Sequence, residues 1–183
     1  MTYTRKPSPD PRREDDTTAP PSKIAHTLVI GIDPAFSGPE GIAALWDGQL
    51  VIAEKHKPPL PVRDTERRIC LAMVSYPATQ IHVVVESWSI LAKGEGTTMD
   101  TVLKLEQAAQ KWMVLAELHG IRTRRVNVST WRAPFRIRGE SAVCKKMAKK
   151  LATQLYGGLY SSDVAEAILI ATWQWNRIKV GIA

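Results

Sequence analysis

Four acidic side chains lie where a carboxylate is costly, beside apolar segments of the chain: Asp33, Glu86, Asp163 and Glu166. The first follows the apolar run 28–32, the second follows three valines at 83–85, and the last two interrupt the mostly apolar segment 161–170. A charge beside a core is unfavourable unless it is paired or binds a metal. Carboxylate oxygens are the hard ligands that Mg²⁺ prefers. These residues therefore predict a site for a divalent metal.

The charge of the chain indicates what such a site would act on. The formal net charge is +7 over 183 residues, and the segment 122–150 holds ten Lys and Arg residues but one acid, Glu140. This density is the electrostatic pattern of proteins that bind a phosphate backbone. The alternative is a solvated helix face and loop whose cations bind no partner. Together with the acids, the basic segment favours an enzyme that cuts a polyanion.

The composition fits a globular protein with a sizeable core, since 44% of residues are hydrophobic and 23% are charged. No apolar run approaches the roughly 20 residues that span a bilayer, and the first residues lack the apolar stretch of a signal peptide. Cys70 and Cys144 are far apart and lack metal-ligand spacing. We therefore expect a reduced, cytoplasmic setting without membrane association.

The chain divides into a tail and one α/β domain. Residues 1–25 hold five of the 12 prolines and few large apolar residues, which predicts a disordered tail before a domain at 26–183. We expect a helix at 65–75 capped by Asp64, a hairpin turn at Asp47-Gly48 and an irregular segment at 129–139. The remaining pattern predicts strands at 27–32, 41–46, 50–54, 80–85 and 121–128, and helices at 98–119, 140–156 and 162–178. This order predicts a mixed five-stranded sheet flanked by α-helices.

Four motifs in this order resemble the RuvC-type Holliday junction resolvases of the ribonuclease H-like superfamily, in a phage or prophage-type branch. They are Val29-Ile30-Gly31-Ile32-Asp33-Pro34, Val84-Val85-Glu86, Leu103-Lys104-Leu105-Glu106-Gln107-Ala108 and Ser162-Asp163-Val164-Ala165-Glu166-Ala167. The resemblance covers residues 27 to about 175. It implies a ribonuclease H-like fold and a nuclease active in the cytoplasm of a bacterium or a phage-infected host.

The resemblance also implies a mechanism. The four acids would hold two Mg²⁺ ions, with Mn²⁺ as a possible substitute, and no small-molecule cofactor would be needed. Two such ions about 3.5–4 Å apart activate a water molecule and stabilise the leaving oxygen of a phosphodiester. The substrate would be branched DNA, a four-way junction that a homodimer nicks symmetrically on two strands. The helix at 98–119, with Trp112 and Met113, is the expected dimer interface.

Contacts to the substrate follow from the family's pattern less directly. Lys145 is the expected catalytic lysine; the other expected DNA contacts are Trp88, Arg132, Arg136, Arg138, Lys146 and Lys149. The family's wedge aromatic corresponds to Ser89 in this chain, so Trp88 is a candidate replacement that would stack on a base. Glu166 stands where the family more usually has aspartate. Trp131 and Phe135 either line a DNA groove or cap the core.

Three other functions stay open. An enzyme on the same fold could cut flaps or other branched DNA, which the missing wedge aromatic would favour. A non-catalytic protein could bind junctions through the basic segment alone. A kinase of the actin-like fold shares a Gly-Ile-Asp-Pro strand such as residues 31–34, but it needs glycine-rich phosphate loops and a second domain, for which this chain is too short.

Overall fold

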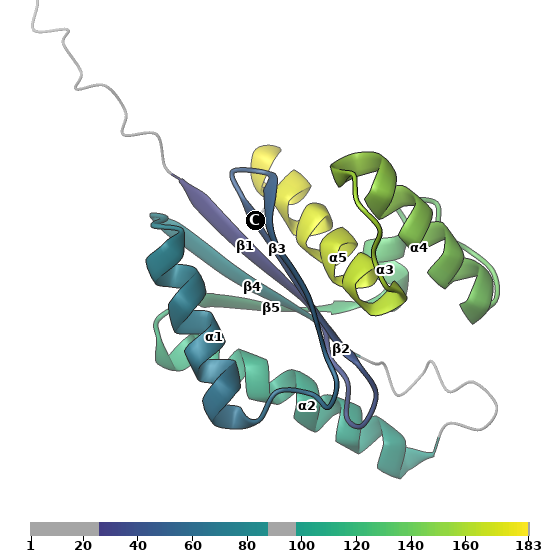
Figure 1. Ribbon diagram of the computed structural model, residues 1–183, viewed down its shortest axis with the longest axis horizontal. Helices are drawn as coiled ribbons and strands as arrows, with labels where there is room; N and C mark the ends of the chain where they lie inside the picture. The colour runs from purple at the N-terminus through teal and green to yellow at the C-terminus, as the bar shows by residue number, and fades with distance from the viewer. Residues whose placement is uncertain (1–25, 88–97, 183) are drawn as a thin grey trace, which may run out of the picture.

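The computed structural model describes residues 26–87 and 98–182; the predicted tail at 1–25 lies outside this part. One five-stranded sheet forms the centre, in the order β3-β2-β1-β4-β5 (Figure 1). β1 pairs with β2 and β2 with β3 in antiparallel fashion, whereas β1, β4 and β5 run parallel. The predicted mixed sheet is thus confirmed. The strands are β1 (Thr27–Asp33), β2 (Glu40–Trp46), β3 (Gln49–His56), β4 (Gln80–Ser87) and β5 (Arg122–Asn127).

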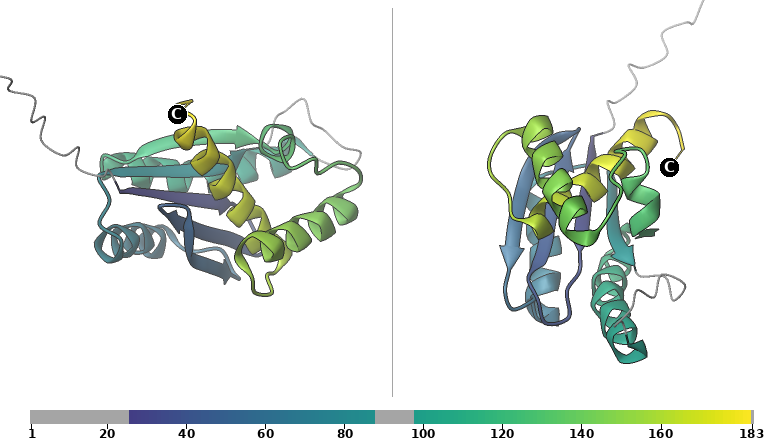
Figure 2. Two further views of the ribbon diagram at one scale, coloured as in Figure 1. Left: turned by 90° about the horizontal axis from the view of Figure 1, so that it is seen from above. Right: turned by 90° about the vertical axis from the view of Figure 1, so that its right-hand side faces the viewer.

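Helices cover both faces of the sheet (Figures 1 and 2). One face carries α1 (Val62–Ser75) and α2 (Met99–Leu118), and the other carries α3 (Val128–Arg132), α4 (Ser141–Tyr156) and α5 (Ser162–Lys179). Alternate residues of each strand point to opposite faces. Accordingly Leu28, Ile30 and Ile32 of β1 join the core under α1 and α2, while Val29 joins the core under α5.

Two glycines bring α5 unusually close to the sheet. A Cβ atom on Gly31 would lie 2.3 Å from the main-chain oxygen of Ala167 on α5. A Cβ atom on Gly41 would lie 2.1 Å from the main-chain oxygen of Asp163, at the start of the same helix. Only glycine permits such close approach of two backbones. α5 therefore lies directly on β1 and β2, and α4 packs against its outer side through Cys144, Ala148 and Ala152.

Several predicted boundaries were wrong in detail. α1 begins at Val62 rather than Thr65, so Asp64 lies in its first turn and Pro61 is the N-cap. A short helix, α3, occupies the start of the segment predicted to be irregular, because five residues are too few to display helical periodicity. The hairpin prediction is supported, since Asp47 and Gly48 both have positive φ. In the described part of the chain, no helix combines the length and apolar character needed to cross a bilayer.

Candidate active site

The sheet topology places the two strand-borne acids side by side. β1 and β4 are parallel neighbours, and Ile32 of β1 lies opposite Val85 of β4. Asp33 directly follows Ile32, and Glu86 directly follows Val85, so the two acids lie side by side at the same edge of the sheet. Val29 of β1 and Val84 of β4 belong to the core under α5. Asp33 lies an even number of residues after Val29, and Glu86 lies an even number of residues after Val84. Side chains alternate along a strand. Both carboxylates therefore project towards the α5 face.

The first turns of α5 supply the other two acids. Asp163 and Glu166 are three residues apart and therefore share one side of the helix; both are buried. The Ser161 hydroxyl accepts a hydrogen bond from the Val164 amide at 3.4 Å and caps the helix just before them. Gly41 lies opposite Asp33 in the β1–β2 pairing and abuts the Asp163 main chain. The glycine thus brings the start of α5 next to Asp33.

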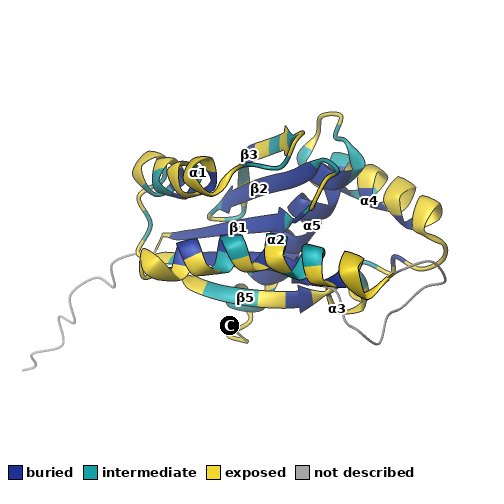
Figure 3. Cartoon of the chain, turned by 90° about the horizontal axis from the view of Figure 1, so that it is seen from below, coloured by how far each residue is buried: buried dark blue, intermediate teal, exposed yellow. Residues whose placement is uncertain are grey.

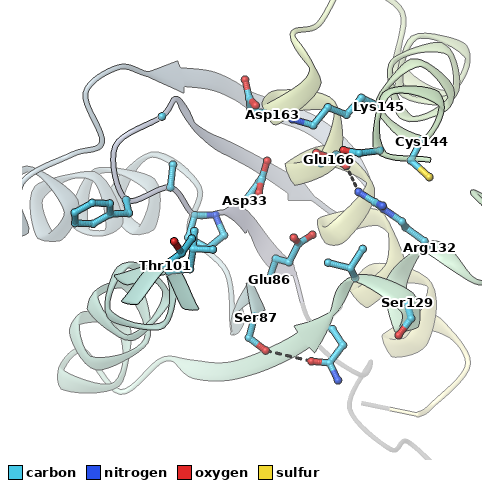
Figure 4. A pocket seen from close by; sticks show the side chains of 18 of the residues that line it. Asp33, Glu86, Ser87, Thr101, Ser129, Arg132, Cys144, Lys145, Asp163 and Glu166 are labelled. Atoms are coloured by element: carbon cyan, nitrogen blue, oxygen red, sulfur yellow. Dashed lines mark hydrogen bonds and ion pairs between the residues drawn. The ribbon is translucent and has the colours of Figure 1, made fainter. Parts of the chain in front are cut away.

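All four predicted acids line one cleft of about 1440 Å³. Figure 4 shows the carboxylates of Asp33, Glu86 and Glu166 pointing towards the same space, with Asp163 at its edge and Lys145 reaching in from α4. Phe36 and Lys104 line the opposite wall, where the Lys104 ammonium lies 4.9 Å from the centre of the Phe36 ring. The cleft thus combines a carboxylate cluster with cations from separate elements.

Three of the acids have direct partners. The indole Nε1 of Trp131 donates a hydrogen bond of 2.7 Å to Glu86 Oε2. The neighbouring Arg132 forms an ion pair with Glu166 from the same short helix, α3. Lys55 of β3 lies with its Nζ 3.5 Å from Asp163 Oδ2 and is itself exposed. Two elements therefore hold these three acids: α3 holds Glu86 and Glu166, and β3 holds Asp163.

The cluster perturbs the protonation of its members. Burial, followed by the charges of Glu86, Glu166 and Asp163, raises the pKa of Asp33 well above its usual value of 3.8. Burial and the charge of Glu166 raise the pKa of Glu86 to about 7, against the opposing hydrogen bond from Trp131. Burial also raises the pKa of Glu166, and Arg132 opposes that rise. The cleft concentrates more negative charge than its cations offset.

The raised pKa of Glu86, caused first by burial and then by the charge of Glu166, predicts that the metal-free protein loses stability as the pH rises. The folded state holds a proton on Glu86 up to about pH 7, whereas the unfolded chain releases it near 4.5. The folded protein therefore binds more protons between these values, and stability falls through this window. We expect the free energy of unfolding, measured with urea in EDTA, to fall between pH 5 and 7.5 for the wild-type protein. For Glu86→Gln this fall should be smaller by on the order of 1–3 kcal/mol.

The exposed Glu140 provides the control for this pH measurement, because its side chain makes no capping hydrogen bond. Glu140→Gln should retain the wild-type pH dependence. An identical loss of stability in Glu86→Gln and Glu140→Gln would contradict the assignment of the effect to the cleft.

The donor set fits the divalent metal that the resemblance implies. Four carboxylates offer the oxygen ligands that Mg²⁺ and Mn²⁺ accept, and a bound cation would offset the negative charge that, after burial, raises the pKa values of Asp33 and Glu86. Within residues 26–87 and 98–182, no three Asp, Glu, His or Cys side chains form a ready-made metal cage. The carboxylates thus share a cleft whose oxygen donors suit a divalent metal.

The predicted DNA contacts separate into groups. Arg132, Arg138 and Lys145 line the cleft. Arg136, Lys146 and Lys149 are exposed but are not among the residues that line it. Trp88, and the wedge position Ser89, lie outside the described residues. The guanidinium of Arg132 also contacts Glu166 within the cleft, and its expected contact with DNA stays a prediction.

The aromatic residues clarify two open points. Trp131 belongs to the core and is fully buried, so it does not line a DNA groove. Trp112 is also buried, at 1% exposure, because it points from α2 towards the sheet; it cannot form the dimer interface as expected. Its indole Nε1 donates to Glu40 Oε2 at 2.8 Å. Glu40 is a fully buried acid that sequence reasoning missed, and it lies on the face of the sheet opposite the cleft.

The role of Trp131 was also missed, although the topology contains a signal for it. Val126 of β5 lies opposite Glu86 in a parallel pairing, so the residues just after β5 must lie at the edge where Glu86 ends β4. A tryptophan five residues beyond Val126 is well placed to meet a buried carboxylate. The strand order needed for this inference was not available from the sequence pattern.

Comparison with solved structures identifies the architecture. No protein-family model and no curated protein matches the chain. The Thermus thermophilus RuvC structure in complex with a Holliday junction substrate matches with a TM-score of 0.62 and 17% identity, over 85% of this chain and 98% of that chain. The fold is that of RuvC. The expected resemblance to RuvC-type resolvases and the ribonuclease H-like sheet are thereby confirmed.

Two further structures agree with the RuvC-like fold. A second Thermus thermophilus RuvC structure matches with a TM-score of 0.61 and 19% identity over 85% of this chain and 98% of that chain. The yeast mitochondrial Holliday junction resolvase Ydc2 matches with a TM-score of 0.50 and 11% identity, over 84% of this chain and 81% of that chain. At these identities the likeness establishes the fold. The phage or prophage-type branch stays a prediction.

Proposed function

We propose that this chain is a Mg²⁺-dependent endonuclease that resolves four-way DNA junctions. The observation that carries the proposal is the convergence of Asp33, Glu86, Asp163 and Glu166 in one cleft of a RuvC-like fold. The same four residues stand out in the sequence as acids beside or within apolar segments. Metal ions bound among these acids would supply the positive charge that offsets the cost of placing them in and beside the core.

Each cleft residue has a proposed part in hydrolysis. The four carboxylates would hold two Mg²⁺ ions, or Mn²⁺ in their place, which supply Lewis-acid chemistry at the scissile phosphate. Asp33, at the centre of the cluster, would be the shared ligand. Lys145 would orient the phosphate and offset charge that develops on its oxygens. Arg132 and Arg138 would hold the DNA backbone at the cleft wall. No small-molecule cofactor enters the scheme, and the setting is the cytoplasm of a bacterium or an infected host.

The exposed side of α4 extends this DNA-binding surface. Because Cys144, Ala148 and Ala152 face α5, the lysines at 145, 146, 149 and 150 lie on the remaining surface of the helix. Figure 3 shows this helix as exposed along its length, beside the buried sheet. Lys145 lies at the cleft, so Lys146 and Lys149 would contact phosphates farther along the same DNA arm. Arg136 would make a similar contact from the loop before α4.

We expect the double variant Lys146→Ala/Lys149→Ala to bind a junction more weakly and with less dependence on salt. Each phosphate contact contributes about 0.9 to the slope of log K against log salt concentration, so the slope should fall by about 2. Fluorescence anisotropy with a labelled junction in Ca²⁺, from 50 to 300 mM salt, measures this change. Arg63→Ala/Arg67→Ala on α1, on the opposite layer, is the matched control. Equal slopes for both double variants would argue against DNA binding along α4.

A homodimer would deliver two symmetric nicks to one junction. With Trp112 buried, the proposed interface moves to the outer surface of α2. Leu103, Val114 and Leu118 are exposed there to 56%, 41% and 74% of their surface. Met113 is partly buried, and its sulfur accepts a hydrogen bond from the Arg125 Nε at 3.2 Å. It would therefore lie at the margin of the proposed dimer interface. Apolar side chains exposed together on one helix are the kind of surface that a second copy covers.

A broader branched-DNA endonuclease is the second candidate, and the serine at the family's wedge position favours it. A substrate panel separates the candidates: a mobile four-way junction, a 5′ flap, a replication fork and a linear duplex, each with Mg²⁺. Junction resolvase activity requires cleavage of the junction at least about tenfold faster than the flap. Equal rates would establish the broader enzyme, and tight junction binding without any cleavage would establish a non-catalytic binding protein.

A further inference from the structure

The buried contact between Trp131 and Glu86 joins a core residue to a carboxylate of the cleft. Trp131 has no exposed surface, and Glu86 is 5% exposed. The donor–acceptor distance of 2.7 Å is short for an N–H donor, as expected when the acceptor is a carboxylate. An indole N–H buried without a partner would be costly. The contact therefore fixes both side chains.

The surroundings of Trp131 leave its ring no room to turn. The ring belongs to the core cluster formed with Val126, Ile137 and Cys144. The Arg132 guanidinium also lies near the ring, 5.1 Å from its centre. Its donor atom is therefore held at one point relative to the end of β4. A carboxylate that accepts from a fixed donor has one preferred rotamer and one oxygen already engaged.

The chemistry of an indole is well suited to orienting a metal ligand. Its N–H is a donor only and carries no charge, so it orients Glu86 without neutralising it. Arg132 acts differently on Glu166, since its positive charge pairs directly with that carboxylate. The partners that orient metal ligands generally act through such hydrogen bonds and affect metal affinity by about 10- to 100-fold.

We propose that Trp131 is a positioning residue, whose indole N–H holds the Glu86 carboxylate in the orientation that binds the metal. The proposal rests on the metal centre of the proposed function. Trp131, on the short helix α3 that follows β5, would thus help to build the metal site in addition to packing in the core. The proposal also explains why a tryptophan, rather than an aliphatic residue of the same core, occupies this position.

The chain contains a matched control for this proposal. Trp112 makes the same kind of contact, a buried indole Nε1 that donates to the buried carboxylate of Glu40 at 2.8 Å. That pair lies on the opposite face of the sheet, away from the cleft. Trp131→Phe and Trp112→Phe each remove one indole–carboxylate hydrogen bond and a similar volume. A purely structural role for Trp131 predicts that both variants behave alike.

The test is Mn²⁺ binding to each protein without DNA, followed by the electron paramagnetic resonance signal of free Mn²⁺, with thermal unfolding recorded in parallel. We expect Trp131→Phe to bind Mn²⁺ about tenfold more weakly than wild type, and Trp112→Phe to bind within twofold. Equal Mn²⁺ affinity for the two variants would overturn the proposal. If the wild-type protein still binds Mn²⁺ in that case, the metal centre of the proposed function stands. Absence of Mn²⁺ binding to wild type would overturn the proposed function itself, and this inference with it.

A second replacement keeps the test decisive if Trp131→Phe does not fold. Site-specific incorporation of β-(3-benzothienyl)alanine at position 131 substitutes sulfur for the indole N–H and retains the shape of the ring. We expect the same loss of Mn²⁺ affinity, of about tenfold, with wild-type unfolding behaviour. Wild-type Mn²⁺ affinity in that protein would show that the N–H has no part in the site, and would overturn the proposal.

Discussion

Asp33→Asn should abolish DNA cleavage and leave junction binding in place. Asp33 ends the central strand β1, and the charges of Glu86, Glu166 and Asp163 all act on it. Asparagine preserves the shape but removes the charge that a shared metal ligand must supply. We expect the rate of junction cleavage in Mg²⁺ to fall at least about 10³-fold, which corresponds to roughly 4 kcal/mol of transition-state stabilisation. Single-turnover cleavage of a labelled junction measures this rate.

Binding and a remote aspartate provide the controls for Asp33→Asn. The variant should bind the junction within about threefold of wild type in Ca²⁺, because the basic surface of α4 is unchanged. Asp64→Asn, in the exposed first turn of α1, should cleave at the wild-type rate. Retention of more than a tenth of the wild-type activity in Asp33→Asn would contradict a central role for this carboxylate.

Gly31→Ala should be among the most destabilising single substitutions in the domain. Its new methyl group would lie 2.3 Å from the main-chain oxygen of Ala167 and 2.6 Å from the main-chain nitrogen of Ala171. Backbone atoms of a buried helix cannot move aside as the end of a flexible side chain can, so α5 must shift. Overpacking of this kind costs about 1–3 kcal/mol, and more where backbone is involved. We expect a loss of about 3 kcal/mol in urea unfolding.

The position of α5 links this prediction to the site, since Glu166 immediately precedes Ala167. Gly31→Ala protein that remains folded should therefore also bind Mn²⁺ more weakly than wild type. Gly38→Ala is the matched control, because a Cβ atom at Gly38 meets nothing within 4 Å. It should change stability by less than about 0.5 kcal/mol. A Gly31→Ala protein as stable as Gly38→Ala would contradict the close packing of α5 on β1.

The elements that position the site were largely predictable because their patterns are long or strongly apolar. The valine run before Glu86 predicts a buried strand, and the spacing of Asp163 and Glu166 predicts one helix face. α5 is buried from Asp163 to Gln174. Acids beside or within such apolar segments are conspicuous in the sequence, and the four carboxylates that stand out in this way line one cleft.

The partners of these acids were not predictable, because they depend on distant segments meeting. Arg132 resembles any other cation of the basic segment until α3 directs it onto Glu166. Trp112 shows helical spacing in the sequence, but its contact with Glu40 joins residues 72 positions apart. Glu40 begins a strand after a loop, where an acid usually faces solvent, and nothing local distinguishes it. Both contacts depend on how the helices pack against each other and on the sheet.

Strand-by-strand mapping of cleavage in a four-way junction tests the central claim most directly. One junction is prepared in four versions, each with a different 5′-labelled strand, and incubated with wild-type protein with and without Mg²⁺. The account predicts nicks that require Mg²⁺, lie at symmetric positions on two opposite strands, and leave 5′-phosphate and 3′-hydroxyl ends. Junction binding with no Mg²⁺-dependent nick in any strand would contradict it, and the carboxylate cleft would then not be a nuclease site.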